Sequence, residues 1–552
     1  MQRITMGVMP IVCASLLAPV NAQTESALAG KMMEILRNSI DPAEQEWRLE
    51  QHRLYRQGNP DRPFQRGPQF KVFEGRSVRP APAMPASSAN AASPVKRILV
   101  LANKTLYADA IAKEKIDRYI EDVRNAHGCT VVLETLEGGK PADIKSVIKD
   151  YYDNGGLDGA VQIGKLPEPW YESDHDPTIG TYDDYTCDLY YMDLDGQWGD
   201  ANNNGEFDSH IAGTGTLGIE IFYGRIDCTT MSTYGSEIDL LSEYMDKLHD
   251  YYLGKVTLHK AALGYLDYDW RTSDNYLKEI YPSSGENELI RWTSSNPPVN
   301  KTDYLTNRLQ KNYSALHMWC HADYNLHAHH TGGYSNMSEV YKANPKPIAY
   351  FQDGCHVSDF AAGRGKSFLG GCYVFNKSPT ALMCLSGSRS GQWLGLMARV
   401  MFQELAKNTC VGQAFKIWFK PYQDKSEPRD KEYFIGWNYG YNIFGDPMIT
   451  LVERDAVVEV TERNRIDPII GNVDCMIKGR TLTFGYTLST ATPVEIDLFT
   501  IAGKRVPSLM SVALNRGGGS VISNWTAVAN GTYIISLKAG SLNDARRLNI
   551  VK

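Results

Sequence analysis

The stretches Arg97-Ile-Leu-Val-Leu101, Thr130-Val-Val-Leu133 and Gly159-Ala-Val-Gln-Ile163 decide the fold. Each is a short apolar run, which is typical of a strand that is buried on both faces. Helical spacing of apolar residues separates them, over residues 108–125 and 141–152. Since parallel strands need such crossover connections, this alternation predicts an α/β fold with a parallel sheet.

The same alternation returns further along the chain. A long helix is expected over residues 236–252 and a later one over residues 394–407. Four more buried strands are expected at residues 260–265, 314–319, 348–352 and 381–385. The sequence therefore predicts two adjacent parallel-sheet α/β subdomains, over residues 96–254 and 255–455.

The N-terminal region differs in character from this core. Arg3, an apolar stretch and Val20-Asn21-Ala22 together predict a secretory signal peptide over residues 1–22. Residues 23–95 contain a helical stretch at residues 44–55 and end in a Pro/Ala/Ser-rich run. Because such a run cannot build a core, this segment is expected to be a pro-segment or an arm that is detached from the sheet.

The C-terminal region, residues 456–552, changes character again. Apolar and polar residues alternate over residues 494–498 and 533–538, and Gly517-Gly-Gly519 and Asn530-Gly531 supply turns. This pattern predicts a β-sandwich.

Composition sets the broad class of the protein. The chain has 552 residues, 57 Lys+Arg against 64 Asp+Glu, a net charge of −7 and 43% hydrophobic residues. These ordinary values exclude wholesale disorder, and the acidic balance argues against nucleic-acid binding. No transmembrane segment is expected in the mature chain. Of ten cysteines, Cys13 belongs to the signal peptide, so an odd number remains and at least one thiol stays unpaired or pairs between chains.

Two of the predicted strands run directly into residues that can do chemistry. His321 follows the strand at residues 314–319, and Cys355 follows the strand at residues 348–352. If these strands are neighbours, the two side chains face each other at the carboxyl edge of the sheet. An imidazole has the right pKa to deprotonate a thiol and to protonate a leaving amine. The pair predicts a Cys–His dyad; the alternative is a structural cysteine beside a hydrogen-bonded loop histidine.

A histidine-rich tract overlaps the first of these positions. Its members are His321, Asp323, His327, His329 and His330. Such tracts bind zinc or nickel, and a metal-dependent hydrolase is one alternative. The irregular spacing favours a solvated active-site loop instead.

A second acidic stretch predicts a Ca²⁺ site. Its candidate ligands are Asp193, Asp195, Asp200, Asn202, Asn204 and Asp208. The alternate spacing and Gly205 match the first half of an EF-hand loop. Since Ile211 stands where the bidentate Glu belongs, we expect a Ca²⁺-stabilised loop and not a full EF-hand; a polar, turn-rich loop is the alternative.

Six short motifs resemble peptidase family C25, the gingipain-type cysteine peptidases with a caspase-like fold. In chain order they are Ile163-Gly-Lys-Leu-Pro167, Cys187-Asp-Leu-Tyr-Tyr191, Gly218-Ile-Glu-Ile-Phe-Tyr-Gly-Arg225, Trp319-Cys-His-Ala322, Gly354-Cys355 with Asp359-Phe360, and Asn442-Ile-Phe-Gly-Asp-Pro447. The resemblance covers roughly residues 96–452. Two departures are Ala322, where the family has Gly, and Lys165, where Asp is usual.

This resemblance implies acyl transfer from protein or peptide substrates, with Cys355 as the nucleophile and His321 managing the protons. Backbone N–H groups near Gly354 and Ala322 would stabilise the oxyanion. The resemblance places Asp188 in a specificity pocket; the alternative is a structural carboxylate. Trp393 is expected to form a wall of that pocket. Glu168 or Glu172 is expected to orient His321.

The C-terminal region resembles the sorting domain of type IX secretion cargo, on the evidence of residues 496–506 and 530–552. It implies the secretion machinery as a partner and a secreted or cell-surface location. The sequence as a whole predicts a secreted, Ca²⁺-supported cysteine endopeptidase. The alternative is a catalytically inactive, peptidase-like cell-surface or adhesion protein.

Overall fold

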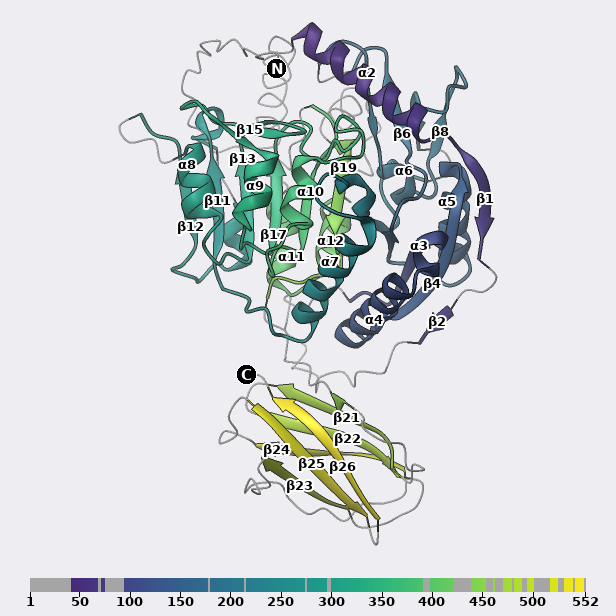
Figure 1. Ribbon diagram of the computed structural model, residues 1–552, viewed down its shortest axis with the longest axis vertical. Coiled ribbons are helices and arrows are strands. Elements are labelled where there is room, and N and C mark those ends of the chain that lie inside the picture. The colour runs from purple at the N-terminus through teal and green to yellow at the C-terminus, as the bar shows by residue number, and fades with distance from the viewer. Residues whose placement is uncertain are drawn as a thin grey trace.

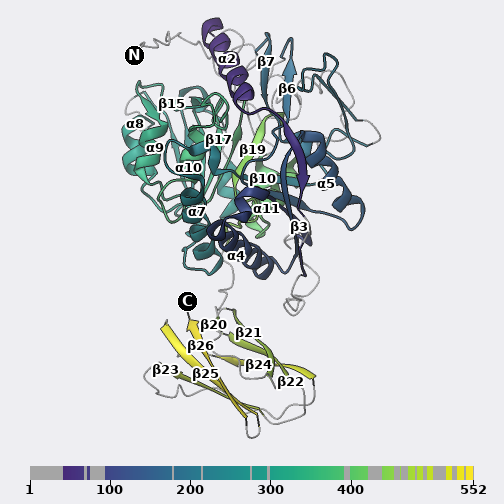
Figure 2. The same cartoon turned by 45° about the vertical axis from the view of Figure 1, so that its right-hand side comes forward.

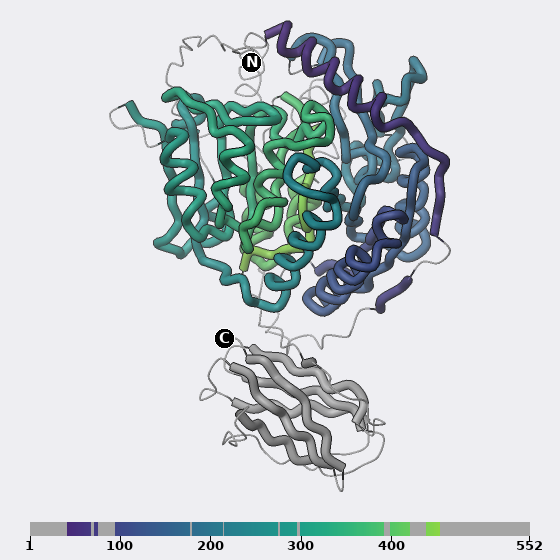
Figure 3. The backbone as a smooth tube through the Cα atoms, in the orientation of Figure 1, coloured from purple at the N-terminus to yellow at the C-terminus, as the bar shows by residue number. Residues whose placement is uncertain are grey.

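The computed structural model describes residues 41–67, 71–74, 94–176, 179–212, 215–273, 276–294, 299–390, 398–419 and 438–452, and the backbone of seven strands after residue 460. Figure 3 traces the backbone as a tube coloured along the chain. The predicted signal peptide, the Pro/Ala/Ser-rich run and Trp393 lie outside the described residues.

Strands between residues 62 and 445 form one large sheet (Figure 1). Its strand order is β1-β4-β3-β5-β10-β19-β18-β17-β13-β11-β12. Its first unit is parallel and contains β4 (Thr130–Gly139), β3 (Arg97–Asn103), β5 (Gly159–Ile163) and β10 (Phe222–Ile226). Its second unit is also parallel and contains β18 (Met383–Gly387), β17 (Ala349–Asp353), β13 (Ala315–Trp319), β11 (Ala262–Leu266) and β12 (Glu288–Arg291). The predicted α/β class with two adjacent parallel units is confirmed.

The two units meet at a strand that the sequence did not predict. β19 (Tyr441–Gly445) runs antiparallel to β18 and joins β10 through one pair, Arg225 with Phe444. The two predicted subdomains therefore share one continuous sheet. Its strands are fully buried along this seam, which explains their uninterrupted apolar character.

Helices cover the sheet, most of them where the apolar spacing predicts them, although the helix over residues 411–419 was not predicted (Figure 1). The main ones are α4 (Ala110–His127), α5 (Pro141–Asp153), α7 (Glu237–Tyr252), α11 (Ala398–Ala406) and α12 (Val411–Phe419). The ends of α4 follow from local chemistry. The Asp109 carboxylate accepts hydrogen bonds from the N–H groups of Ile111 and Ala112, and Gly128 ends the helix with a φ of 65°.

The segment before the sheet is not a detached arm, and that expectation was wrong. β1 (Arg62–Arg66) and β2 (Lys71–Phe73) both pair antiparallel with β4. The preceding helix α2 (Pro42–Gly58) lies across the ends of the strands in both views of the ribbon (Figures 1 and 2). The segment is thus joined to the large sheet by strand pairing.

Helix α2 is held by buried charges. Nδ1 of His52 lies 2.7 Å from Asp184 and its Nε2 lies 2.9 Å from Asp359. Arg48 donates to Asp323 at 2.9 Å. Burial alone would lower the pKa of His52, but the two carboxylates outweigh burial and raise it to about 10. His52 is therefore a buried imidazolium.

The C-terminal region forms two antiparallel sheets, as its alternating pattern predicts. One contains β20 (Val460–Thr461), β26 (Leu542–Ile550), β25 (Gly531–Ala539) and β23 (Val494–Thr500). The other contains β21 (Ile470–Lys478), β22 (Thr481–Leu488) and β24 (Gly517–Asn524). Among the described residues, no helix combines the length and the apolar character that a bilayer crossing requires.

Candidate active site

The strands that lead to His321 and Cys355 are neighbours. β13 and β17 pair in parallel, with Trp319 opposite Asp353. His321 and Cys355 each follow two residues later, so both leave the sheet at the same edge. A Cβ added to Gly354 would lie 2.8 Å from Cβ of Ala322 and 2.9 Å from the carbonyl oxygen of Cys320. The two segments are therefore in contact beside the predicted dyad.

Cys355 stands at a sharp turn of the backbone. The next residue, His356, has a φ of 59°, which a non-glycine residue rarely adopts. Two contacts of His356 hold this turn. Its backbone N–H donates to the carbonyl oxygen of Arg389 at 3.0 Å, and Nε2 of its ring lies 2.8 Å from Oγ of Ser390. Cys355 itself is partly exposed, and the eight cysteines in the described part of the chain are all thiols.

His321 opens the short strand β14 (His321–Asp323), and its side chain is 42% exposed. Its Nε2 lies 2.8 Å from Oδ2 of Asp269. Burial tends to raise the pKa of Asp269, but the hydrogen bond and charge of His321 outweigh it and lower the pKa. When Nε2 carries a proton toward Asp269, Nδ1 keeps the lone pair that can accept a thiol proton.

Asp269 is the partner that sequence reasoning missed. It lies in the 3-10 turn η2 (Tyr268–Trp270), directly after β11, which pairs with β13. The two residues expected in this role lie elsewhere. Glu168 accepts from the hydroxyl of Tyr55, and Glu172 accepts from the hydroxyl of Tyr182. Its position just beyond a buried strand is the signal that could have identified Asp269 from the sequence.

Asp188 is not placed to read a substrate, which corrects the sequence expectation. Its carboxylate is fully buried and accepts from Nε of Arg225 at 2.6 Å and from Nη2 of the same side chain. The two groups form a bidentate pair inside the molecule. Since Arg225 already satisfies this carboxylate, Asp188 is a structural residue of the first unit.

The six predicted Ca²⁺ ligands divide into two groups. Asp193 and Asp195 join Glu220 in a set whose carboxylate oxygens lie within 4.8 Å of one another. In the other group, Oδ1 of Asp200 and of Asn202 accepts from the N–H of Asn204, and Asp208 accepts from that of Ala201. These oxygens stabilise turns of their own loop.

The histidine-rich tract is not a solvated loop, contrary to expectation. It forms a three-stranded antiparallel sheet of β14, β15 (Leu326–Ala328) and β16 (Tyr334–Asn336). His327 and His329 are buried, with 1% and 5% of their surface exposed.

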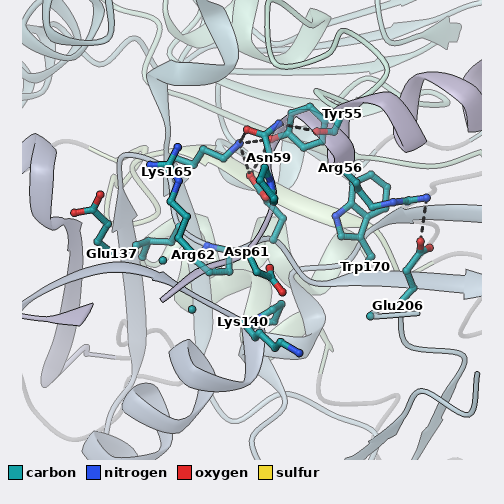
Figure 4. A pocket seen from close by; sticks show the side chains of 18 of the residues that line it. Tyr55, Arg56, Asn59, Asp61, Arg62, Glu137, Lys140, Lys165, Trp170 and Glu206 are labelled. Atoms are coloured by element: carbon teal, nitrogen blue, oxygen red, sulfur yellow. Dashed lines mark hydrogen bonds and ion pairs between the residues drawn. The ribbon is translucent and has the colours of Figure 1, made fainter. Parts of the chain in front are cut away.

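A depression in the first unit does not include the two predicted catalytic residues. It has a volume of about 390 Å³, and Tyr55 and Arg56 of α2 line it together with Asn59, just after that helix, and Lys165. Figure 4 shows Lys165 reaching toward Asn59, to whose side-chain oxygen it donates at 2.6 Å. Neither His321 nor Cys355 is among its lining residues.

The family comparison covers the region that carries both parallel units. The model of peptidase family C25 matches residues 93–452, which include both parallel units. The chain belongs to peptidase family C25. It is therefore a cysteine peptidase, a hydrolase that acts on protein substrates.

Solved structures show only distant likeness. One, described as a protease, is 12% identical, covers 82% of this chain and 97% of that chain, and has a TM-score of 0.47. Wild-type OgpA from Akkermansia muciniphila is 8% identical, covers 83% of this chain and 93% of that chain, and has a TM-score of 0.13. These scores are too low to support an argument. The comparison with curated proteins gave no match.

Proposed function

We propose that this C25 peptidase is a secreted endopeptidase that cleaves peptide bonds through Cys355 and His321. The observation that carries the proposal is the adjacent pairing of β13 and β17, which delivers both side chains to one edge of the sheet. Asp269, at 2.8 Å from His321, adds a residue that orients the imidazole. The contact of Gly354 with Ala322 supports the close approach of the two segments.

The proposed reaction has two stages. His321 takes the thiol proton, and the thiolate of Cys355 attacks the carbonyl carbon of the scissile bond. His321 then gives the proton to the leaving amine as the acyl-enzyme forms. In the second stage His321 deprotonates a water molecule, which attacks the thioester and releases the new carboxylate. Asp269 holds Nε2 of His321 throughout.

Backbone N–H groups near Gly354, Cys355 and Ala322 are the proposed oxyanion donors. Ala322 keeps the N–H of the Gly that is usual in the family, and its extra methyl lies 2.8 Å from where a Cβ on residue 354 would stand, a space that Gly354 leaves open. The departure at this position therefore does not remove the donor.

Stabilisation by Ca²⁺ stays a prediction, and the candidate ligands are now Asp193, Asp195 and Glu220. Burial, reinforced by the two neighbouring aspartates, raises the pKa of Glu220 to about 7. A hard divalent cation would relieve this repulsion. A Ca²⁺-dependent rise in melting temperature that is absent in Glu220→Gln is the expected result.

Secretion also stays a prediction, since it rests on the N-terminal signal and the sorting-like C-terminal region. We expect the secretion machinery to act through residues 456–552. Deleting that region should leave the chain in the producing cell.

The direct test of endopeptidase action is the fragment pattern from a denatured protein substrate. The purified full chain, supplied with Ca²⁺, should produce internal fragments, mapped by mass spectrometry, and Cys355→Ala should produce none. Release of terminal residues alone would contradict endopeptidase action. Absence of any cleavage by the folded parent chain, together with a Cys355 that iodoacetamide does not alkylate, would favour the inactive scaffold.

A further inference from the structure

A second set of cysteine, histidine and aspartate side chains lies next to the catalytic residues. One ligand-capable atom from each of Asp267, Cys320 and His329 lies within 4.8 Å of the other two. All three side chains are buried, with 1%, 1% and 5% of their surface exposed. The proposed peptide hydrolysis uses none of them.

His329 presents the arrangement of a metal-binding imidazole. Its Nε2 lies 2.7 Å from Oγ of the buried Ser335, while its Nδ1 is buried without a hydrogen-bond partner. A ligating histidine usually donates its second N–H to a nearby group, and Ser335 fills that role. Burial, with Lys301 nearby, lowers the pKa of His329 to about 4, so the ring is in its neutral, ligating form.

Cys320 and Asp267 face each other across the same small space. Sγ of Cys320 lies 3.5 Å from Oδ2 of Asp267 and donates to the carbonyl oxygen of Ala328 at 3.2 Å. Asp267 is a buried carboxylate, and within the described chain no ion pair reaches it; the N–H groups of Tyr268 and His330 are its other partners. A cation at this point would supply the missing positive charge.

We propose that Asp267, Cys320 and His329 bind Zn²⁺, with a water molecule as the fourth ligand. A thiolate, an imidazole and a carboxylate form a typical zinc donor set, whereas Ca²⁺ and Mg²⁺ prefer oxygen ligands alone. Tetrahedral Zn²⁺ with its usual bond lengths separates ligand atoms by roughly 3.5 Å, so small side-chain movements close the site. Binding replaces the thiol proton of Cys320, which passes to solvent.

The site is positioned to stabilise the catalytic pair. Cys320 immediately precedes His321, and Asp267 stands two residues before Asp269. Zn²⁺ would therefore tie the end of β13 to the turn that carries the partner of His321. This metal has a positioning role, and no step of peptide hydrolysis passes through it.

Metal titration of the full chain tests the site. We would use the Cys355→Ala variant, so that the candidate nucleophile cannot bind metal and the chain cannot digest itself, in Ca²⁺-containing buffer after Zn²⁺ removal. Co²⁺ serves as the probe, because its bond to a thiolate absorbs in the near ultraviolet. One equivalent of Co²⁺ should produce this absorption, and Zn²⁺ should displace it.

Two further changes on that background locate the site. Cys320→Ser should abolish the thiolate absorption and weaken Zn²⁺ binding at least about 100-fold. Cys384→Ser, at a buried thiol near Ser386, should keep both. His329→Gln covers the case in which Cys320→Ser does not fold: it should remove the rise in melting temperature that Zn²⁺ causes.

Absence of the absorption in the parent variant, or its survival in Cys320→Ser, would overturn the proposal. So would an undiminished Zn²⁺-dependent stabilisation in His329→Gln. Since every measurement uses an inactive background, the outcome does not depend on whether the chain hydrolyses peptides.

Discussion

Two groups of cysteine, histidine and aspartate lie side by side in the second unit and differ in exposure. In one group the His321 side chain is 42% exposed, that of Asp269 is 23% exposed, and Cys355 is partly exposed. In the other group, Asp267, Cys320 and His329 are buried. Members of the two groups alternate along the chain: Cys320 directly precedes His321, and Asp267 stands two positions before Asp269.

This difference in exposure decides what each group can do. A substrate carbonyl must reach the nucleophile, and only the exposed group permits that. In the buried group, burial and the charge of Asp267 raise the pKa of the Cys320 thiol well above its usual value. Such a thiol is inert toward carbonyl carbon, but a metal can still displace its proton. Under the two proposals, the same residue types would serve catalysis at the surface and metal binding below it.

The sharpest contrast comes from removing a single thiol. Cys355→Ala should lower kcat/KM for a peptide substrate by at least about 10³-fold, because no other group can form the acyl-enzyme. The matched control is Cys384→Ala, at a buried thiol in β18, which should keep the parent rate. A Cys355→Ala variant that hydrolyses at the parent rate would remove the distinction between the two groups.

Asp269→Asn tests the carboxylate of the exposed group. An amide cannot hold the Nε2 proton of His321 as strongly, so kcat should fall roughly 10²-fold while KM changes little. Asp269→Glu should recover part of the rate, and iodoacetamide should alkylate Cys355 more slowly in Asp269→Asn. A rise in KM as large as the fall in kcat, together with an unchanged rate of alkylation, would indicate that the Asp269 carboxylate has only a structural role.

Gly354→Ala tests the contact between the two groups. The new methyl would meet Cβ of Ala322 at 2.8 Å and the carbonyl oxygen of Cys320 at 2.9 Å. Forcing these apart should cost about 1–3 kcal/mol of unfolding free energy, measured by urea denaturation, and should reduce activity as well. Gly285→Ala is the control, because a Cβ there has no atom within 4 Å. Equal stability of the two variants would show that the segments are looser than described.

How much of this site the sequence could predict depends on how far apart along the chain the residues of each contact lie. His321 and Cys355 each directly follow an apolar strand, so local pattern was enough to propose them as a pair, and the dyad itself stays a prediction. Asp269 escaped because its partner lies 52 positions away, on a neighbouring strand. Asp188 was misjudged for the same reason, since its burial depends on Arg225, at a separation of 37 positions.

The fold divides in the same way. Strands β3, β5 and β17 are continuous apolar runs and were predicted within two residues of their observed bounds. The docking of α2 could not be predicted, because the residues that it buries, among them Arg48 and His52, are polar. Only the carboxylates that meet them, far along the chain, make their burial favourable.

The smallest expected effect concerns His52. This buried histidine has a raised pKa, whereas burial lowers the pKa of His329. Asp184 and Asp359 face His52, and Arg48 and Arg56 flank it on α2. Its pKa rises from 6.5 to about 10 on folding. Its stabilisation is therefore complete below about pH 6.5 and is lost as the pH rises through about 10.

His52→Gln should remove that dependence. Proteolysis within α2 should accelerate with rising alkaline pH in the parent chain, and should be faster and less pH-dependent in the variant. Identical pH profiles in the two proteins would contradict a charged His52.

The central claim, that Cys355 is the activated thiol, is tested most directly by its reactivity. The full chain, with Ca²⁺ present at neutral pH, would be treated with iodoacetamide and its modified cysteines mapped by mass spectrometry. The account predicts fast alkylation of Cys355, much slower alkylation of the buried Cys320, and loss of the fast reaction in His321→Ala. Alkylation of Cys355 no faster than that of Cys320, or a rate unaffected by His321→Ala, would contradict it.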